Sequence, residues 1–323
     1  MAFALDTHWV WDFWVADDGE MFHLFYLRAP KSLGDPELRH RHARIGHATS
    51  TDLAVWTDHG EVLGPGAPGD FDATATWTGS VIRGDDGLWR MFYTGSVFLE
   101  QGSARNVESI GMATSADLHR WDKRDGFVLR AAEEYYEKLG DTAWHEEAWR
   151  DPWVFRDPAG DGWHMLITAR GAAGTMTAGG VVGHAWSPDL DTWTVQPPLN
   201  DPSRTFAHLE VFQVAEVDGV SVLLFSAPRT TGGTEGVWIV RADAVPRDAA
   251  VDDASLLLAA PHYAGRIVHD RAGEPVVLAF VGSPGAGAEP AGITDPLPAR
   301  ALLAASAPSL DAAGGIRDRH LRR

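Results

Sequence analysis

The chain contains no cysteine among its 323 residues. This absence excludes disulfide bonds, thiolate metal ligands and a cysteine nucleophile. It also agrees with a reducing compartment, where proteins rarely depend on disulfides for stability.

The N-terminal residues Met1-Ala2-Phe3-Ala4-Leu5-Asp6 lack the basic and apolar regions of a secretory signal peptide. No apolar run elsewhere in the chain is long enough to span a membrane. We therefore expect a cytoplasmic protein without a membrane partner.

Positive charge is scarce. Lys and Arg number 27 against 45 Asp and Glu, which gives a formal net charge of −18. An acidic surface of this kind repels nucleic acids and anionic lipids, so neither is an expected partner. It does not repel a neutral small carbohydrate, and it leaves the oligomeric state open.

Tryptophan, in contrast, is abundant, with 14 residues, and apolar residues make up 45% of the chain. Tryptophan rings fill deep cores, and they also provide flat apolar faces on which sugars stack. Because all-β domains often exceed the usual domain length, one large β domain is compatible with this chain.

A turn that ends in glycine recurs five times, at Gly19, Gly87, Gly162, Gly219 and Gly273. Each copy is followed by a short run of aliphatic, β-branched and aromatic residues. Asp precedes Gly in four copies, a pair that is typical of β-hairpins. A motif repeated at the spacing of one propeller blade indicates a repeat architecture.

A second motif, Ser/Thr-x-Asp-Leu-x-x-Trp, occurs three times and ends at Trp56, Trp121 and Trp193. Each copy lies between two strand-like runs, so it predicts the turn between the third and fourth strands of a four-stranded meander. The sequence therefore predicts an all-β fold, a five-bladed β-propeller with four-stranded antiparallel blades. An irregular β-sandwich would not explain why the same turn motif recurs at the same position of each repeated unit. We assign residues 1–285 to the propeller and 286–323 to a closing segment and tail.

The strand before each glycine-ended turn should be the innermost strand of its blade. Roughly equivalent positions in these strands are occupied by Asp12, Trp77, Asp151, Glu210 and Tyr263. We expect them to converge on one funnel at the propeller axis. Three neighbouring carboxyl groups cannot all ionise normally, and one ionised and one protonated carboxyl can cleave a glycosidic bond. The alternative is structural, with each acid paired to a neighbouring arginine.

The run Arg39-His40-Arg41-His42-Ala43-Arg44 is conspicuously basic. We interpret it as a solvated loop at the rim of the first blade rather than as a metal site. Elsewhere the sequence contains no convincing ligand set, so we expect neither a metal nor a cofactor.

Four short motifs resemble those of the five-bladed glycosidases of glycoside hydrolase families 32 and 68, which act on β-fructofuranosides. Val10-Trp11-Asp12-Phe13-Trp14 is similar to the nucleophile motif in its levansucrase form. Trp77-Thr78-Gly79-Ser80 and Arg150-Asp151-Pro152 look like the sugar-contact motif and the Arg-Asp-Pro triplet. Leu209-Glu210-Val211 lies where the acid/base glutamate is expected. The resemblance covers roughly residues 8–282, and no C-terminal β-sandwich is expected.

The resemblance implies a retaining mechanism in which Asp12 is the nucleophile, Glu210 the acid/base and Asp151 the transition-state stabiliser. Apolar tryptophan walls are expected to keep Glu210 protonated. Glu146 and Glu147 are lower-ranked rival acids or contacts for the leaving sugar. The residues implied in substrate contacts are Trp11, Trp14, Trp77, Thr78, Ser80, Arg150 and Tyr263.

Sucrose or short fructo-oligosaccharides are the expected substrates, with hydrolysis and transfer both open. One alternative is an inverting enzyme like those of family 43, which acts on arabinofuranosides or xylosides. Carboxyl groups about 5–5.5 Å apart favour retention, and about 6.5–9.5 Å inversion. The other alternative is a non-catalytic sugar-binding propeller.

Overall fold

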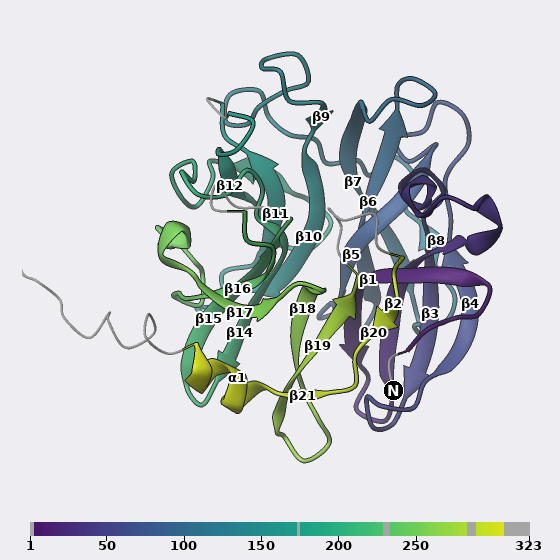
Figure 1. Ribbon diagram of the computed structural model, residues 1–323, viewed down its shortest axis with the longest axis vertical. Coiled ribbons are helices and arrows are strands. Elements are labelled where there is room, and N and C mark those ends of the chain that lie inside the picture. Colours follow the sequence, from purple (N-terminus) through teal and green to yellow (C-terminus); the bar gives the residue numbers. More distant parts are fainter. Residues whose placement is uncertain (1–2, 173–174, 229–232, 283–288, 307–323) are drawn as a thin grey trace, which may run out of the picture.

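The computed structural model describes residues 3–172, 175–228, 233–282 and 289–306. Within these ranges the chain forms five small sheets around a common centre (Figure 1). The innermost strand of each sheet contacts the innermost strand of the next, and the fifth contacts the first, so the ring is closed. These observations confirm the predicted five-bladed β-propeller.

The blades follow the order of the chain, and each begins with its innermost strand. Blade 1 contains β1 (His8–Asp17), β2 (Phe22–Pro30), β3 (Arg44–Ser50) and β4 (Thr57–Leu63). Blade 2 contains β5 (Ala75–Arg83), β6 (Trp89–Phe98), β7 (Asn106–Ser115), β8 (Asp122–Lys123) and β9 (Glu146–Glu147). Blade 3 contains β10 (Trp149–Arg156), β11 (Trp163–Arg170), β12 (Gly180–Ser187) and β13 (Thr194–Gln196). Blade 4 contains β14 (Glu210–Val217), β15 (Val220–Ala227), β16 (Gly236–Arg241) and β17 (Ser255–Ala259).

Blade 5 closes the propeller in a less regular way. Its strands are β18 (His262–His269), β19 (Pro275–Val281), β20 (Gly292–Ile293) and β21 (Leu297–Pro298), and β19 pairs with both short strands. Phe3 forms a two-way backbone bridge with Ile293, with N–O distances of 2.7 and 2.9 Å. The start of the chain is thus joined to the last blade, and helix α1 (Ala299–Ala305) follows β21.

The predicted boundary between residues 285 and 286 falls in the segment 283–288, which is outside the described residues. The predicted tail is also outside them from residue 307 onward. In the part of the chain that is described, no helix is long and apolar enough to cross a membrane.

The Ser/Thr-x-Asp-Leu-x-x-Trp motifs form the turns between the third and fourth strands of blades 1, 2 and 3, as expected. In blade 2 the Ser115 hydroxyl accepts the Leu118 N–H at 2.9 Å, and Leu118 takes the left-handed conformation at φ +65°. The Trp121 indole N–H then donates to the Leu118 carbonyl at 3.1 Å. These local bonds explain why the motif recurs at the same turn of each blade.

The core lies between neighbouring blades, in four clusters of buried apolar residues. One cluster joins blade 2 to blade 3 through Phe92, Met112, Trp149 and Met165. Each sheet is covered on both faces, so its middle strands are buried along most of their length rather than at alternate residues. All eight residues of β11 are buried for this reason.

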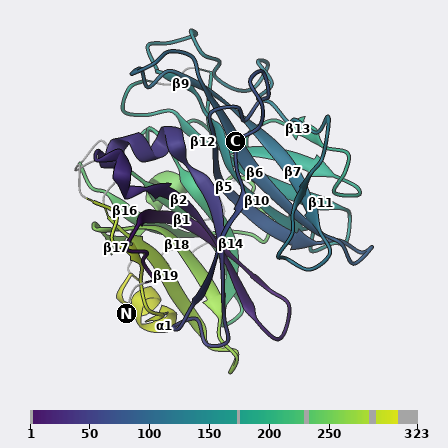
Figure 2. The ribbon, with the colours of Figure 1, turned by 90° about the vertical axis from the view of Figure 1, so that its right-hand side faces the viewer.

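Among the described residues, three short 3₁₀ helices interrupt the sheets: η1 (Lys31–Leu33) and η2 (Pro36–His42) between β2 and β3, and η3 (Val251–Asp253) in blade 4. The Asp35 carboxylate caps the N-terminus of η2 by accepting a hydrogen bond from the Glu37 N–H at 2.9 Å. Figure 2 shows this purple segment towards the upper end of the molecule, with α1 towards the lower end. The interpretation of this run as a solvated loop is wrong for Arg39, which is only 1% exposed.

Candidate active site

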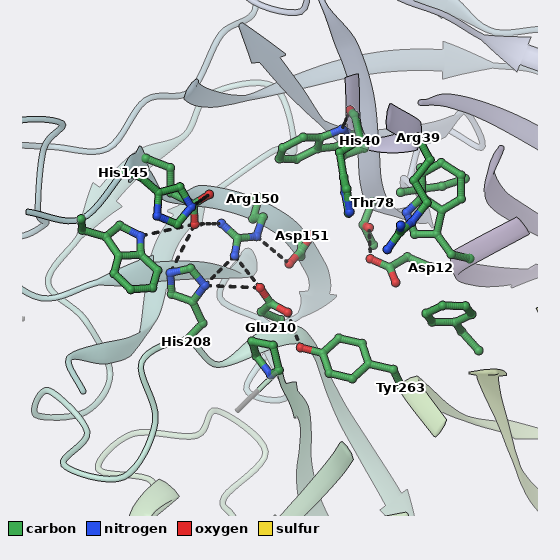
Figure 3. A pocket seen from close by; sticks show the side chains of 17 residues that line it. Asp12, Arg39, His40, Thr78, His145, Arg150, Asp151, His208, Glu210 and Tyr263 are labelled. Atoms are coloured by element: carbon green, nitrogen blue, oxygen red, sulfur yellow. Dashed lines mark hydrogen bonds and ion pairs between the residues drawn. The ribbon is translucent and has the colours of Figure 1, made fainter. Parts of the chain in front are cut away.

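A cavity of about 400 Å³ is lined by residues from the innermost strands of all five blades (Figure 3). This volume lies within the range of about 300–1,000 Å³ that is typical of small-molecule sites. It contains eight of the predicted site residues, namely Trp11, Asp12, Trp77, Thr78, Arg150, Asp151, Glu210 and Tyr263. The rest of the lining is Leu27, Arg39, His40, Trp144, His145, Glu146, His208, Pro228 and Phe280.

A β-bulge occurs in every innermost strand at the position that faces this cavity. The pairing of β1 with β2 shifts between Trp11 and Phe13, which leaves Asp12 unpaired. Equivalent shifts occur in β5, β10, β14 and β18. A bulge bends its strand and re-aims a side chain, and bulges are common beside active sites. The five bulges therefore direct one set of side chains from five blades towards a single space.

Three of these bulges contain a non-glycine residue in the left-handed region. Asp151 and Val211 both have φ +56°, and Ala264 has φ +49°. Such residues are rare and persist where the surroundings hold them in place. The Asp151 N–H donates to the Thr94 hydroxyl and the Ala264 N–H to the Ser226 hydroxyl, both at 2.9 Å. Each of these bonds links a bulge to the second strand of the preceding blade.

Asp12 is a half-buried acid whose Oδ2 accepts a hydrogen bond from the Thr78 hydroxyl at 3.0 Å. Burial raises the pKa of Asp12 to about 6, and the negative charge of Glu210 adds to the effect. The carboxyl group is therefore mostly ionised at neutral pH but protonates readily below it.

Asp151 is buried and lies between Asp12 and Glu210 in the site (Figure 3). Its Oδ2 accepts hydrogen bonds from the Thr168 hydroxyl at 2.9 Å and the Val211 N–H at 3.4 Å. Burial raises the pKa of Asp151 to about 7, although the charge of Arg150 opposes the rise. This acid can hold a proton under physiological conditions.

Arg150 contacts four carboxyl groups. Its Nη1 lies 2.9 Å from Glu146 and 3.1 Å from Glu108, and its Nη2 lies 2.5 Å from Glu210. Its Nε lies 3.6 Å from Asp151. Burial alone would lower the pKa of Arg150, but the surrounding carboxylates raise it well above its usual value. One guanidinium thus compensates the charge of several buried acids.

Glu210 is held in its charged form in this structure. It accepts hydrogen bonds from Arg150 and from the Tyr263 hydroxyl, and the His208 Nδ1 lies 3.3 Å from its Oε1. Burial raises its pKa, but Arg150, His208 and Tyr263 together hold the pKa well below its usual range. The prediction that apolar walls keep Glu210 protonated is therefore wrong for this state, because its partners are polar.

The two rival acids differ in position. Glu146 lines the cavity, with its Oε1 3.3 Å from the His208 Nε2. Glu147 is not part of the lining and forms an ion pair with Lys138. Burial raises the pKa of Glu108 to about 8. Burial would also raise the pKa of Glu146, but Arg150 and the neighbouring histidines lower it below its usual value.

Comparison with known proteins agrees with this geometry. The family model described as the glycosyl hydrolases family 32 N-terminal domain matches residues 14–292, which is most of the chain. The chain belongs to glycosyl hydrolases family 32.

Two curated family 32 relatives are similar to this chain over about half of its length. The sucrose-6-phosphate hydrolase of Pediococcus pentosaceus is 28% identical over 180 residues, or 55% of this chain and 32% of that protein. The raffinose invertase of Escherichia coli is 31% identical over 155 residues, or 47% of this chain and 28% of that protein. The match therefore spans about a third of each relative at most.

The fold is also similar to that of a solved inulosucrase from Halalkalicoccus jeotgali bound to kestose. The TM-score is 0.66 at 22% sequence identity, and the match covers 87% of this chain and 79% of the other. At this identity the likeness concerns the arrangement of the blades rather than the chemistry of the site.

Two of the predicted substrate contacts of this family 32 chain lie outside the lining of the cavity. Trp14 is fully buried and stacks on Phe25 with ring centroids 6.0 Å apart. Ser80 is also buried, and its hydroxyl accepts the Val154 N–H at 3.1 Å, which joins blade 2 to blade 3. Both residues lie two positions beyond the unpaired residue of a bulge, Asp12 or Thr78, where the regular alternation of the strand is interrupted.

Sequence reasoning missed the contribution of η2, whose Arg39 and His40 line the cavity. The Trp77 indole N–H donates to the His40 carbonyl at 2.8 Å and fastens η2 to β5. Burial lowers the pKa of His40 to about 3, so this imidazole is neutral. The basic run was a visible signal, but its charge suggested exposure to solvent.

Glu108 and His208 were also missed, and no local motif marks either residue. Glu108 belongs to the third strand of blade 2, and His208 precedes β14. Glu108 reaches the site through Arg150, whereas His208 lines the cavity itself and has its Nδ1 2.7 Å from the Arg150 Nη2. Among the described residues, the one close group of three metal-ligating side chains, His47, His59 and His119, is not part of this cavity.

Proposed function

We propose that this chain is a retaining glycoside hydrolase that cleaves β-fructofuranosides such as sucrose through a covalent fructosyl-enzyme. The observation that carries the proposal is the convergence of Asp12, Asp151 and Glu210 on one cavity from three blades (Figure 3). Membership of family 32 supports the fructoside as the substrate class.

In the first step, the Asp12 carboxylate attacks the anomeric carbon of the fructosyl ring while Glu210 protonates the departing oxygen. The bond formed is an ester between Asp12 and the sugar, and the glycosidic bond breaks. In the second step, water attacks this ester and gives its proton to Glu210, which restores both carboxyl groups. Asp151 and Arg150 hold ring hydroxyls while positive charge develops on the ring.

Glu210 must gain a proton before the first step, although its partners favour the charged form. A sugar hydroxyl that accepts a hydrogen bond from Arg150 weakens the contact between Arg150 and Glu210. The sugar also displaces water from the cavity, and both changes raise the pKa of Glu210. The neighbouring acids with raised pKa, Asp12 and Asp151, provide a nearby store of protons.

The test is incubation of the purified protein with sucrose, raffinose and sucrose 6-phosphate in dilute methanol, with products separated by chromatography. Retention predicts methyl β-fructofuranoside beside free fructose. Asp12→Asn should abolish both products. Glu210→Gln should lose activity on sucrose. On p-nitrophenyl β-fructofuranoside, whose leaving group needs no proton, it should release one burst of p-nitrophenol and then hydrolyse the fructosyl-enzyme slowly, because the base for water is missing.

Glu147→Gln is the matched control, because this acid is not part of the cavity lining, and its turnover should stay close to that of the wild type. Methyl α-fructofuranoside would instead indicate inversion, and release of arabinose from an arabinofuranoside would move the protein to the pentosidase alternative. Binding of sugars without turnover would leave only a sugar-binding role.

A further inference from the structure

Four histidines form a cluster on blade 1, separate from the cavity. His23 lies in β2, His47 in β3 and His59 in β4, and His119 comes from the Asp-Leu turn of blade 2. The ring centroid of His47 lies 5.0 Å from that of His59 and 4.9 Å from that of His119. One ring nitrogen from each of these three residues lies within 4.8 Å of the other two.

Hydrogen bonds fix where the protons of the inner pair lie. An Asp18 carboxylate oxygen lies 3.2 Å from the His23 Nε2, and a carboxylate only accepts, so this nitrogen carries the hydrogen. The neutral ring then has a lone pair on its Nδ1, which lies 2.9 Å from the His47 Nε2. The His47 Nε2 must donate here, and this leaves the lone pair of His47 on its Nδ1.

This Nδ1 of His47 is buried and has no hydrogen-bond partner among the described residues. A buried polar atom without a partner is costly, and such an atom in a native fold calls for an explanation. A ligand that accepts the lone pair would supply one. His59 and His119 are exposed and offer their rings beside it.

We propose that His47, His59 and His119 bind a divalent transition-metal ion of the zinc class. Three neutral imidazoles are a ligand set that Zn²⁺ accepts, with water in the fourth position. The Asp18–His23–His47 relay is the kind of outer contact that orients a metal-bound histidine. Thr49 contacts the His59 Nε2 at 2.8 Å and holds the second ring.

The distances between the three ring nitrogens allow a metal ion to bind after small movements of the side chains. Metal–nitrogen bonds of about 2.0–2.1 Å in tetrahedral geometry place the nitrogens about 3.4 Å apart. Rotation of the two exposed rings, His59 and His119, brings the observed spacing to this value, while His47 stays fixed by its relay.

Blade 3 provides an internal comparison. It repeats the relay, with Asp157 2.8 Å from His164 and His164 2.9 Å from His184. In blade 3, however, the outer strand β13 (Thr194–Gln196) contains no histidine, and no group of three ligands is found there within the described residues. The relay of an acid and two histidines thus occurs in both blade 1 and blade 3. In blade 1, His59 and His119 complete a set of metal ligands.

The experiment uses untagged, chelator-treated protein titrated with Co²⁺ and, by calorimetry, with Zn²⁺. We expect one ion per chain and the visible absorption of tetrahedral Co²⁺. His59→Ala and His119→Ala should each weaken binding at least tenfold, and the double variant should abolish it. His269→Ala, which removes an exposed histidine of blade 5, should bind as the wild type does.

Both single variants alter exposed residues, so the fold should persist and can be checked by thermal melting without metal. Zn²⁺ should raise the melting temperature of the wild type but not that of the double variant, because His119 would tie blade 2 to blade 1. Equal Co²⁺ binding by the double variant and the wild type would overturn the proposal, as would no binding at all. Neither readout depends on fructoside turnover.

Discussion

At the residue scale, the charge state of the cavity depends on Arg150. Its guanidinium lies against Glu108, Glu146, Asp151 and Glu210, and it contacts Glu210 at 2.5 Å. Glu210, which makes the closest contact with Arg150, keeps its charge. Asp151 lies farther from Arg150 and is deeply buried, so its pKa is raised. The site therefore carries its protons on acids other than the proposed proton donor.

Thr78→Val tests the proposed nucleophile through pH. The Thr78 hydroxyl donates to Asp12 and so favours the charged carboxylate, against the burial that raises its pKa to about 6. Activity should rise with pH as Asp12 ionises, and the limb of kcat/KM near pH 6 reports this group in the free enzyme. Removal of the hydroxyl should move this limb upward by about one pH unit.

Thr76→Val is the matched control, because Thr76 lies on the same strand and its hydroxyl contacts the Leu63 carbonyl instead. Its pH profile should coincide with that of the wild type. A profile of Thr78→Val that coincides with this control would show that Asp12 does not set the acidic limb.

Asp12→Asn should stabilise the protein while it abolishes turnover. The folded pKa of Asp12, about 6, is above the ordinary value of 3.8, so ionisation opposes folding as pH rises through this window. At pH 7.5 the variant should gain on the order of 2 kcal/mol in the free energy of unfolding, and the gain should shrink towards zero near pH 4. Denaturation in urea at several pH values measures the difference.

The exposed Asp201 provides the comparison for this experiment, since Asp201→Asn should change stability little at any pH. An Asp12→Asn protein that is less stable than the wild type at pH 7.5 would contradict the raised pKa.

The main site residues could be predicted because the blade phase places Asp12, Asp151 and Glu210 at equivalent positions. Glu108 and η2 could not, because they reach the cavity through contacts between segments far apart in the sequence. His208 lies close to Glu210 in the chain, but no local motif marks it. The charge state of Glu210 was also out of reach. It depends on distances to Arg150, His208 and Tyr263 that no spacing in the chain specifies.

At the scale of elements, the bulges of the innermost strands build the site. Blade 2 achieves its bulge with glycine: a Cβ on Gly79 would lie 2.2 Å from the Phe92 carbonyl oxygen of the paired strand. The close backbone approach at this point leaves Thr78 directed at Asp12.

Gly79→Ala should therefore destabilise the fold by at least about 3 kcal/mol, because backbone must move to make room. Gly87→Ala is the control: it has φ +80°, but a Cβ there would meet only the Arg83 side chain at 3.8 Å, so it should cost only about 1 kcal/mol. Urea denaturation followed by tryptophan fluorescence compares the two. Equal losses of unfolding free energy in the two variants would mean that the backbone at the bulge can move at little cost to accommodate a Cβ atom.

The strands themselves could be predicted from their glycine-ended turns, but the bulges could not. A bulge is defined by the pairing of two strands, and the sequence of one strand does not reveal it. Trp14 and Ser80 were assigned from the family motifs, and both lie just beyond a point where the register shifts and outside the lining of the cavity.

At the scale of the whole molecule, closure of the ring depends on the bridge between Phe3 and Ile293. Phe3 is 8% exposed and packs edge-on against Tyr26, with ring centroids 5.0 Å apart. The sequence predicted the number of blades and a closing segment within residues 286–323, but not the pairing of this segment with Phe3, because nothing local connects residues at opposite ends of the chain.

Phe3→Ala should lower the free energy of unfolding by about 3 kcal/mol, through the lost burial and the cavity left beside blade 1. Val55→Ala, at a side chain that is 73% exposed, should change it by less than about 0.5 kcal/mol. Thermal and urea denaturation of both variants provide the measurement. Similar values for the two would show that the Phe3 side chain contributes little to stability.

The Phe3–Ile293 bridge also has a mechanical consequence. Tension applied between the two ends of the chain is borne first by its two backbone hydrogen bonds, before any strand in blades 2 to 4 is loaded. Rupture at this seam would separate blade 1 from blade 5 and part Asp12 from Tyr263, which stand on opposite sides of it. The cavity would thus open along one line while the other blades remained stacked.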